Sequence, residues 1–405
     1  MQLMGVIMLV GCIGKANVGK STFFKALTLA EVEIANYPFV TIKPNSGIGF
    51  VKVDCVDKEF DVKCQPKYGY CLNSKRFVPV QVLDVAGLVP GAHEGKGMGN
   101  QFLDDLRQAD VLIHIVDVAG STNEKGESVE PGSYDPANDI KFLEVELDMW
   151  FLRLIKKGWE DFAKKTSQEK SELYKAVAKH LSGLGVNEKI MESVIKKLEL
   201  STNIMEWDED SLKKLATELR KATKQMIIAC NKIDVPGAAE NFTKLENEFP
   251  DHMLIACSAE SELALREAAK HDLIKYIPGE NNFEIIHEEK LNEKQKKALG
   301  FIKKNVLEKY QSTGIQQILD DAVYKLLKYI AVYPVANSHL EDKDGNKLPD
   351  CFLVPQGTTA LGFAFKVHTD IGNNFIKAID LKTKQVIGKE HQLKHRDVIE
   401  IVVSK

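Results

Sequence analysis

The sequence predicts an α/β protein whose first domain contains a mostly parallel sheet. Three observations support this prediction. An apolar segment at 6–13 is typical of a strand, and it leads directly into a Gly-rich loop and a helix. Further apolar strands near 77–83, 111–116, 225–230 and 252–256 alternate with helical segments. Polar motifs follow several of these strands, at the edge where open α/β sheets bind their ligands.

The Gly-rich loop at 14–21 has the spacing of a phosphate-binding Walker A motif. Its glycines let backbone N–H groups point inward, and the start of the next helix adds partial positive charge. Lys20 can reach the β- and γ-phosphates, and the Ser21 hydroxyl can bind Mg²⁺. A chance Gly-rich turn is the alternative, and the flanking strand and helix argue against it. The predicted nucleotide-binding residues here are Gly14, Lys15, Ala16, Asn17, Val18, Gly19, Lys20, Ser21 and Thr22.

A D-x-x-G motif closes the strand at 77–83. Its Asp84 can hold Mg²⁺ through water, and the N–H of Gly87 can contact the γ-phosphate. This motif is weak alone. Behind a strand and downstream of a Walker A motif, it indicates the second half of a nucleoside-triphosphate site. The loop that follows, 91–99, is rich in glycine and is expected to order when nucleotide binds.

Two later strand ends carry residues suited to reading a guanine base. After the strand at 225–230 the chain has N-K-x-D, whose aspartate can accept hydrogen bonds from guanine N1–H and the 2-amino group. After the strand at 252–256, a Ser-Ala turn can offer a backbone N–H to the guanine O6. The predicted base-binding residues are Asn231, Lys232, Asp234, Ser258 and Ala259. Four motifs in this order predict a GTP-binding domain.

Composition limits the class of protein. The 405 residues carry a net charge of −4, which argues against a wholly basic nucleic-acid binder and still allows a local basic patch. No apolar run reaches about 18 residues, so no membrane-spanning helix is expected. The segment 1–10 leads into the phosphate loop, and cleaving it as a signal peptide would destroy the motif. Seven cysteines, an odd number, indicate a reducing cytoplasm.

Three of these cysteines, Cys55, Cys64 and Cys71, lie close together in the sequence. Their spacing matches no common zinc pattern. The sequence therefore favours ordinary free thiols over a metal site.

The pattern of elements divides the chain into three parts. Residues 1–287 form the α/β domain, interrupted at 138–222 by an insertion that is expected to be a helical hairpin or small bundle. Residues 288–330 are expected to be a helical connector. Residues 331–405 contain short strands and form a separate α+β domain. Basic side chains gather at 366–396, and they indicate either a solvated face or an RNA contact.

Several of these stretches together resemble one family. The loop at 14–21, the segment Asn36-Tyr37-Pro38-Phe39 with Thr41, the run at 84–95 and the basic C-terminal domain are similar to the Obg superfamily. Within it, the chain resembles the YchF and Obg-like ATPase group, in particular its archaeal or related eukaryotic branch. The resemblance implies a helical insertion and a C-terminal TGS domain with a ubiquitin-like β-grasp. It also implies a translation-associated nucleotide hydrolase that binds ribosomes or RNA.

Two positions bear on the chemistry that the resemblance implies. ATP-using members of the group carry N-x-x-E, whereas Asp234 keeps the GTPase form and favours GTP. Leu88 follows D-x-x-G where many GTPases have a glutamine that orients water, and leucine cannot bind water. His93 is the nearest titratable candidate for that role. The alternative is a solvent-facing histidine.

These observations predict a cytoplasmic, monomeric GTPase switch. Lys20 and a Mg²⁺ ion held by Ser21, Thr41 and Asp84 would stabilise the charge that develops as GTP becomes GDP. The expected macromolecular partner is the ribosome or RNA, contacted through the C-terminal domain, with no membrane involved. Asn17 is a candidate K⁺ ligand or an ordinary loop residue. The alternative functions are an ATP-hydrolysing regulator and a nucleotide-gated RNA-binding adaptor with negligible hydrolysis.

Overall fold

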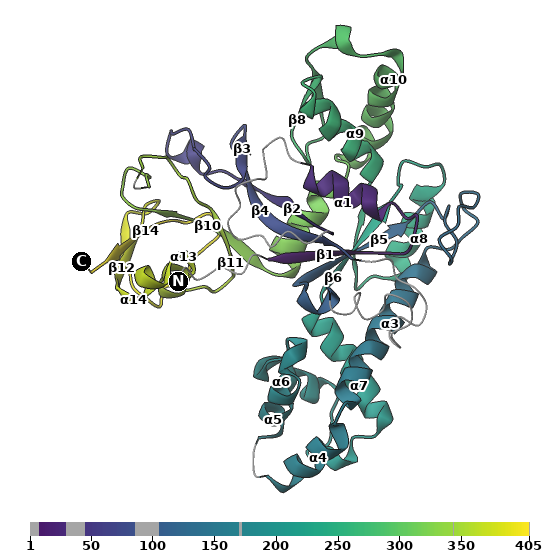
Figure 1. The fold of residues 1–405 in the computed structure, drawn as a ribbon, viewed down its shortest axis with the longest axis vertical. Helices are drawn as coiled ribbons and strands as arrows, with labels where there is room; N and C mark the ends of the chain where they lie inside the picture. The colour runs from purple at the N-terminus through teal and green to yellow at the C-terminus, as the bar shows by residue number, and fades with distance from the viewer. Residues whose placement is uncertain (1–7, 30–44, 86–104, 170–171, 343, 405) are drawn as a thin grey trace.

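A computed structural model describes residues 8–29, 45–85, 105–169, 172–342 and 344–404. A central sheet, a helical arm and a C-terminal sheet extend in different directions (Figure 1). The predicted fold class, a P-loop α/β domain with a helical insertion and a C-terminal α+β domain, is confirmed. None of the described helices is long and apolar enough to cross a membrane.

The central sheet is seven-stranded, with the order β2-β4-β1-β5-β6-β7 and β3 paired to β4. Strands β1, β4, β5, β6 and β7 run parallel, while β2 and β3 are antiparallel to β4. The strands are β1 Leu9–Ile13, β2 Ser46–Asp54, β3 Tyr70–Leu72, β4 Lys75–Asp84, β5 Val111–Asp117, β6 Met226–Asn231 and β7 Met253–Ala256. Their apolar runs are explained by burial, because helices cover both faces.

One face of this sheet is covered by a helix that the sequence assigns to a connector. Val10, Cys12 and Ile113 pack against α1 (Lys20–Thr28), α9 (Ala259–Lys270) and α12 (Ile315–Asp321). The connector region also contains α10 (Glu293–Ile302), α11 (Glu308–Tyr310) and π-helical turns at Lys303–Leu307 and Ala322–Leu326. Helix α12 therefore belongs to the core of the first domain, and the next strand begins at Tyr329. A two-stranded sheet that the sequence did not predict, β8 (Ile274–Tyr276) with β9 (Phe283–Ile285), precedes this region.

The opposite face supports the helical arm between β5 and β6. Helices α3 and α7 lie side by side, α5 and α6 lie along the arm next to α7, and α4 lies toward its far end (Figure 1). Trp150, Phe151 and Leu219 are buried in the core that they share. Helix α8 (Ala238–Glu248) covers the same face nearer to β6. The arm comprises α3 Ala137–Lys156, α4 Trp159–Gln168, α5 Leu173–His180, α6 Glu188–Lys197 and α7 Glu209–Thr223. Asn187 caps α6, as its side chain accepts a hydrogen bond from Ile190 N at 3.0 Å.

The C-terminal domain is a five-stranded sheet of order β11-β10-β14-β12-β13 with its own core. Phe363 in α13 is buried against Val332 and Ile399 of the sheet. The elements are β10 Tyr329–Val335, β11 Phe352–Pro355, α13 Ala360–Val367, α14 Thr369–Asn373, β12 Phe375–Asp380, β13 Gln385–Ile387 and β14 Val398–Val403. Single 3-10 turns lie at Asp57–Glu59, Ser182–Leu184, Ile204–Glu206 and Glu288–Lys290.

Candidate nucleotide site

The loop between β1 and α1 has the backbone shape of a phosphate cradle. Gly19 precedes α1 with φ 92, in the left-handed region that glycine adopts without strain. A Cβ on Gly14 would lie 2.6 Å from the carbonyl oxygen of Ile115, so the neighbouring strand requires glycine there. No side chain of the described residues caps α1, which leaves the N–H groups of its first turn available to an anion.

Lys20 and Asp84 lie at the mouth of this loop and form an ion pair through Lys20 Nζ and Asp84 Oδ1. Asp84 ends β4, which is the neighbour of β1 in the sheet. Its backbone is fixed by Asn45, whose carbonyl accepts from Asp84 N at 2.8 Å and whose amide donates to Asp84 O at 3.0 Å. The two groups assigned to phosphate and to metal are thus brought together. If they bind the predicted phosphate and Mg²⁺, both groups must exchange this ion pair for the ligand.

Asn231 joins the phosphate loop to the predicted base-binding turn. Its side-chain amide donates to Val18 O at 2.9 Å, and its side-chain oxygen accepts from Ala259 N at 2.9 Å. The residue is buried, with 3% of its surface exposed. The N–H of Ser258 is also engaged, by Thr313 O at 2.9 Å. A guanine O6 would therefore share the Ala259 N–H with Asn231 or find another donor.

Lys232 is held by a residue that the motif analysis missed. Its ammonium lies 2.9 Å from Asp117 Oδ2, at the buried end of β5. Asp117 also accepts hydrogen bonds from the hydroxyls of Ser121 and Thr122, at 2.7 and 2.6 Å. The sequence does carry a signal for Asp117, because an aspartate at the carboxyl end of a buried parallel strand lies at the edge where such sheets bind ligands.

Asp234 lies in the turn after β6 and is partly exposed. Within the described part of the chain, no hydrogen bond or ion pair engages its carboxylate. The carboxylate is therefore available to accept hydrogen bonds from a ligand, as the guanine reading requires.

The Lys15 side chain points away from the phosphate cradle. Its ammonium donates to Thr122 O at 2.8 Å, lies 2.8 Å from Asp139 Oδ2, and sits 3.8 Å from the centre of the Tyr134 ring. Burial raises the pKa of the Asp139 carboxyl, and the Lys15 ammonium opposes that rise. The Lys15 side chain is therefore not available to a nucleotide, and only the backbone N–H of Lys15 could make the predicted contact.

Asn17 is also tied to the segment between β5 and α3. It adopts φ 61, and its amide donates to Gly126 O at 2.8 Å. The side-chain oxygen that was predicted to bind K⁺ has no hydrogen-bond partner among the described residues. Ser21 and Ala16 are exposed, Thr22 is partly exposed and Val18 is buried. Thr41, Gly87, Leu88, His93 and the loop at 91–99 lie outside the described residues.

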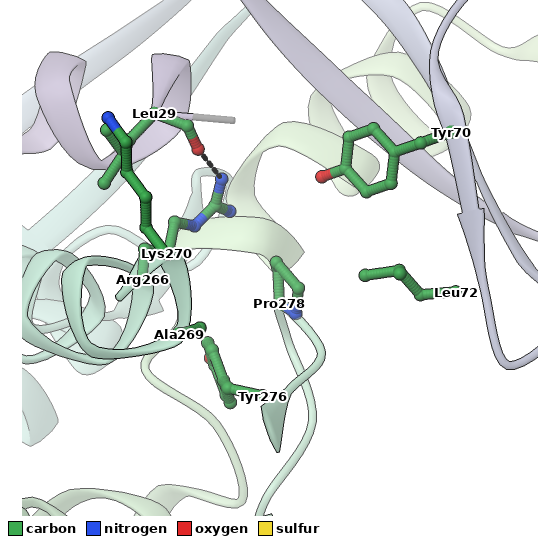
Figure 2. Close-up of a pocket in the computed structure, with 8 residues that line it drawn as sticks. All are labelled: Leu29, Tyr70, Leu72, Arg266, Ala269, Lys270, Tyr276 and Pro278. Atoms are coloured by element: carbon green, nitrogen blue, oxygen red, sulfur yellow. Dashed lines mark hydrogen bonds between the residues drawn. The ribbon is translucent and has the colours of Figure 1, made fainter. Parts of the chain in front are cut away.

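A pocket elsewhere in the domain is separate from this cradle. It lies beyond the C-terminal end of α1 and is lined by Leu29, Tyr70, Leu72, Arg266, Ala269, Lys270, Tyr276 and Pro278 (Figure 2). Arg266 donates to Leu29 O at 3.3 Å and pairs with Glu262 at 2.6 Å. This buried arginine joins α9 to the C-terminal end of α1. The phosphate loop lies at the other end of α1, so the pocket is not part of the predicted nucleotide site.

Comparison with known families matches three parts of the chain. An Obg-like GTPase family, YGR210-like and described as a G4 motif-containing domain, matches residues 229–337. A family described as 50S ribosome-binding GTPase matches 9–144, and the TGS domain matches 343–403. The chain thus contains the phosphate-binding, base-binding and C-terminal parts in the predicted order.

Several known proteins are similar to this chain over nearly its whole length. A GTP-binding protein of Methanocaldococcus jannaschii is 48% identical over 395 residues, which are 97% of this chain and 98% of the relative. The crystal structure of a GTP-binding protein from Pyrococcus horikoshii is 37% identical, with a TM-score of 0.78 over 98% of this chain and all of its own. A protein of Bacillus subtilis named ribosome-binding ATPase YchF is 28% identical over 382 residues, 91% of this chain and 87% of the relative.

The geometry of Lys15 predicts a structural role for its side chain. Lys15→Met should lower the free energy of unfolding by about 3–5 kcal/mol, because it leaves Asp139 buried without its cation. Urea denaturation measures this change. The double variant Lys15→Met/Asp139→Leu should recover most of the loss and keep its nucleotide affinity within a few fold of the native value.

Lys25→Met, on the exposed side of α1, is the matched control and should change stability little. Full stability of Lys15→Met together with loss of nucleotide binding would show that the side chain serves the ligand instead.

Proposed function

We propose that this chain, which belongs to the YchF-type group of Obg-like GTPases, binds and hydrolyses GTP as a switch that acts with the ribosome. The single observation that carries the choice of nucleotide is Asp234, whose carboxylate has no partner among the described residues and lies in the turn after β6. Asn231, the last residue of β6, is bonded to the phosphate loop at Val18. This link supports the proposal, because the proposed base-binding and phosphate-binding loops are held together by one residue.

The preference for GTP follows from the donors and acceptors of the two bases. An ionised carboxylate only accepts hydrogen bonds. Guanine presents two donors, N1–H and the 2-amino group, on the edge that Asp234 would meet. Adenine has a lone pair at N1 and no 2-amino group. The relative named ribosome-binding ATPase is 28% identical, which leaves room for a different base preference.

The phosphate chemistry rests on groups at the mouth of the cradle. Lys20 and the first N–H groups of α1 would bind the β- and γ-phosphates and stabilise the charge that develops in hydrolysis. The Ser21 hydroxyl and the Asp84 carboxylate are hard oxygen ligands that suit Mg²⁺. Bound Mg²⁺ would neutralise phosphate charge at this point. Thr41, Gly87 and His93 complete the proposed site as a metal ligand, a γ-phosphate contact and a water-positioning group.

Potassium is a further part of the proposal. The side-chain oxygen of Asn17 has no described partner, while its amide is anchored on Gly126. The anchor fixes the orientation of the side chain, so the oxygen could hold a K⁺ ion against the phosphates. Such an ion would supply the positive charge that no described arginine provides to the cradle.

Ribosome or RNA contact is assigned to the C-terminal domain. Lys377, Lys384, Lys389 and Lys394 are exposed there, and none has an ion-pair partner among the described residues. The family described as 50S ribosome-binding GTPase and the ribosome-binding relative support this partner. The chain would act in the cytoplasm as a monomer.

Base selectivity is tested at Asp234. Asp234→Glu should weaken GTP binding by about 10-fold or more, because the longer side chain displaces a charge-assisted pair of hydrogen bonds. Its affinity for ATP relative to GTP should rise. Competition of GTP and ATP against a fluorescent guanine nucleotide in one buffer measures both.

Asp251→Glu makes the same chemical change at an exposed position before β7 and should leave both affinities unaltered. Equal affinity of the native chain for ATP and GTP would refute the proposed selectivity.

Hydrolysis is tested at Lys20 and Asn17 by single-turnover phosphate release in matched K⁺ and Na⁺ buffers. Lys20→Ala should slow release by about 100-fold or more, because it removes a cation from the transition state. The native chain should be faster in K⁺ than in Na⁺. Asn17→Ala should remove that difference.

Lys25→Ala removes a lysine from the exposed side of the same helix and serves as the control. Undiminished turnover in Lys20→Ala would exclude this cradle as the site of hydrolysis. Equal native rates in the two salts would leave Asn17 with a structural role.

Ribosome binding is tested by co-sedimentation of the full chain with cognate ribosomes over a range of salt. Changing Lys377, Lys384, Lys389 and Lys394 to glutamine should weaken binding by about 10-fold or more and flatten its salt dependence, because fewer counterions are released. Four exposed lysines of the helical arm, Lys179, Lys189, Lys213 and Lys221, provide the matched control. Equal losses in the two variants would argue against a specific role of the C-terminal domain.

A further inference from the structure

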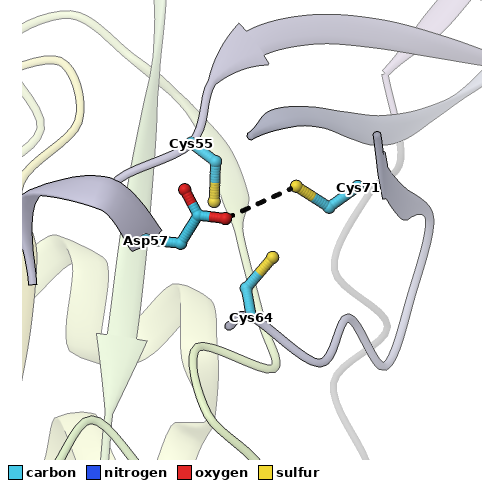
Figure 3. Close-up of side chains that lie close together, drawn as sticks. All are labelled: Cys55, Asp57, Cys64 and Cys71. Atoms are coloured by element: carbon cyan, nitrogen blue, oxygen red, sulfur yellow. Dashed lines mark hydrogen bonds between the residues drawn. The ribbon is translucent and has the colours of Figure 1, made fainter. Parts of the chain in front are cut away.

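A cluster of metal-binding side chains lies outside the nucleotide site. Cys55, Asp57, Cys64 and Cys71 each offer one ligand atom, and these four atoms lie within 4.8 Å of one another. The residues come from the end of β2, the 3-10 turn that follows it, the next loop and β3. Figure 3 shows the three sulfur atoms and the carboxylate facing a common centre.

We propose that these four residues form a structural zinc site, unrelated to the Mg²⁺ of the nucleotide site. Three thiolates and one carboxylate are a ligand set that zinc accepts in tetrahedral geometry. Four protein ligands leave no open position, as in structural rather than catalytic zinc sites.

The distances fit a site that closes around the ion. Zn–S bonds of about 2.3 Å in a tetrahedron hold sulfur atoms about 3.8 Å apart. The four candidate ligand atoms are somewhat farther apart, within 4.8 Å of one another. Small side-chain movements would therefore bring all four atoms to bonding distance.

Burial makes the cluster costly without an ion. Only 4% of Cys55, 8% of Cys64 and 7% of Asp57 is exposed. Asp57 Oδ1 accepts a hydrogen bond from Lys58 N, and no described cation pairs with the carboxylate. Burying a carboxylate without a cation is unfavourable, and a divalent ion would compensate it. Cys71 is only partly buried, so the ion has a route of entry.

A buried arginine lies beside the cluster, because Arg76 of β4 stands opposite Cys71 of β3 in the sheet. Arg76 has 1% of its surface exposed and donates to the carbonyls of Leu348 and Pro349, at 3.0 and 2.7 Å. A buried cation beside the cluster would offset part of the negative charge of a thiolate-rich zinc site.

The cluster lies where the two domains meet. Cys55 and Cys64 share a buried core with Tyr333, Leu348 and Val398 of the C-terminal domain. Backbone hydrogen bonds join the loop that carries Cys64 to the same domain, from Gln65 N to Lys347 O at 2.8 Å and from Lys67 N to Pro349 O at 2.9 Å. Bound zinc would hold together the segment 55–71, against which the C-terminal domain packs.

Metal analysis of the full chain tests the proposal. The native chain, purified under reducing conditions and supplied with Zn²⁺, should retain about one equivalent of zinc after dialysis. Cys64→Ser and Cys71→Ser should retain almost none. Cys351→Ser is the matched control because Cys351 packs in the same core and is outside the four-residue cluster. It should retain the native amount.

A measurement on the native chain avoids dependence on variants that fail to fold. Co²⁺ should give the intense visible absorption and sulfur-to-metal charge-transfer bands of a tetrahedral thiolate site. Zn²⁺ should displace it and protect three thiols from alkylation. Absence of these bands, zinc retention by Cys64→Ser, or a disulfide among the three cysteines in the zinc-free native chain would overturn the proposal.

Discussion

Two hydrogen bonds of the buried Asn231 side chain join the predicted phosphate loop to the predicted base-binding turn. One reaches the phosphate loop at Val18 and the other reaches the start of α9 at Ala259. These contacts join loops that follow β1, β6 and β7, three strands that are not all neighbours in the sheet. An amide can do this because it carries a donor and an acceptor on one short, rigid group. The relative position of these loops is therefore fixed by contacts within the chain.

The parts of the fold that sequence could predict are those with local causes. The phosphate loop, the buried strands and the capping of α6 by Asn187 follow from residues close together in the chain. The role of Lys15 does not, because its partner Asp139 lies on the helical arm and no spacing rule relates the two. The same holds for Asp117 with Lys232. It also holds for α12, which covers the central sheet although it lies in the segment that the sequence assigns to a connector. The cysteine cluster shows no regular spacing in the sequence because its side chains come from separate elements, and Asp57 lies among them.

The C-terminal domain is connected to the nucleotide site through β4. Arg76, near the start of this strand, donates to Leu348 and Pro349 of the C-terminal domain. Asp84, at its end, pairs with Lys20 of the phosphate loop. A strand within a packed sheet is a stiff element. The contact of β4 with the C-terminal domain and its contact with the phosphate loop are therefore made by one rigid strand. The cysteine cluster lies beside the same strand, since Cys71 of β3 pairs with Arg76.

The contact between Lys15 and Asp139 gives the helical arm a mechanical relation to the phosphate loop. Asp139 lies in the first turn of α3, a helix of 20 residues. A helix of that length is a rod of about 30 Å. Any rotation about the end held by Lys15 is magnified along the rod, so that a tilt of about 5° displaces the far end by about 3 Å. The start of the arm is thus bonded to the predicted phosphate-binding loop, and a small rotation there gives a large displacement at the far end.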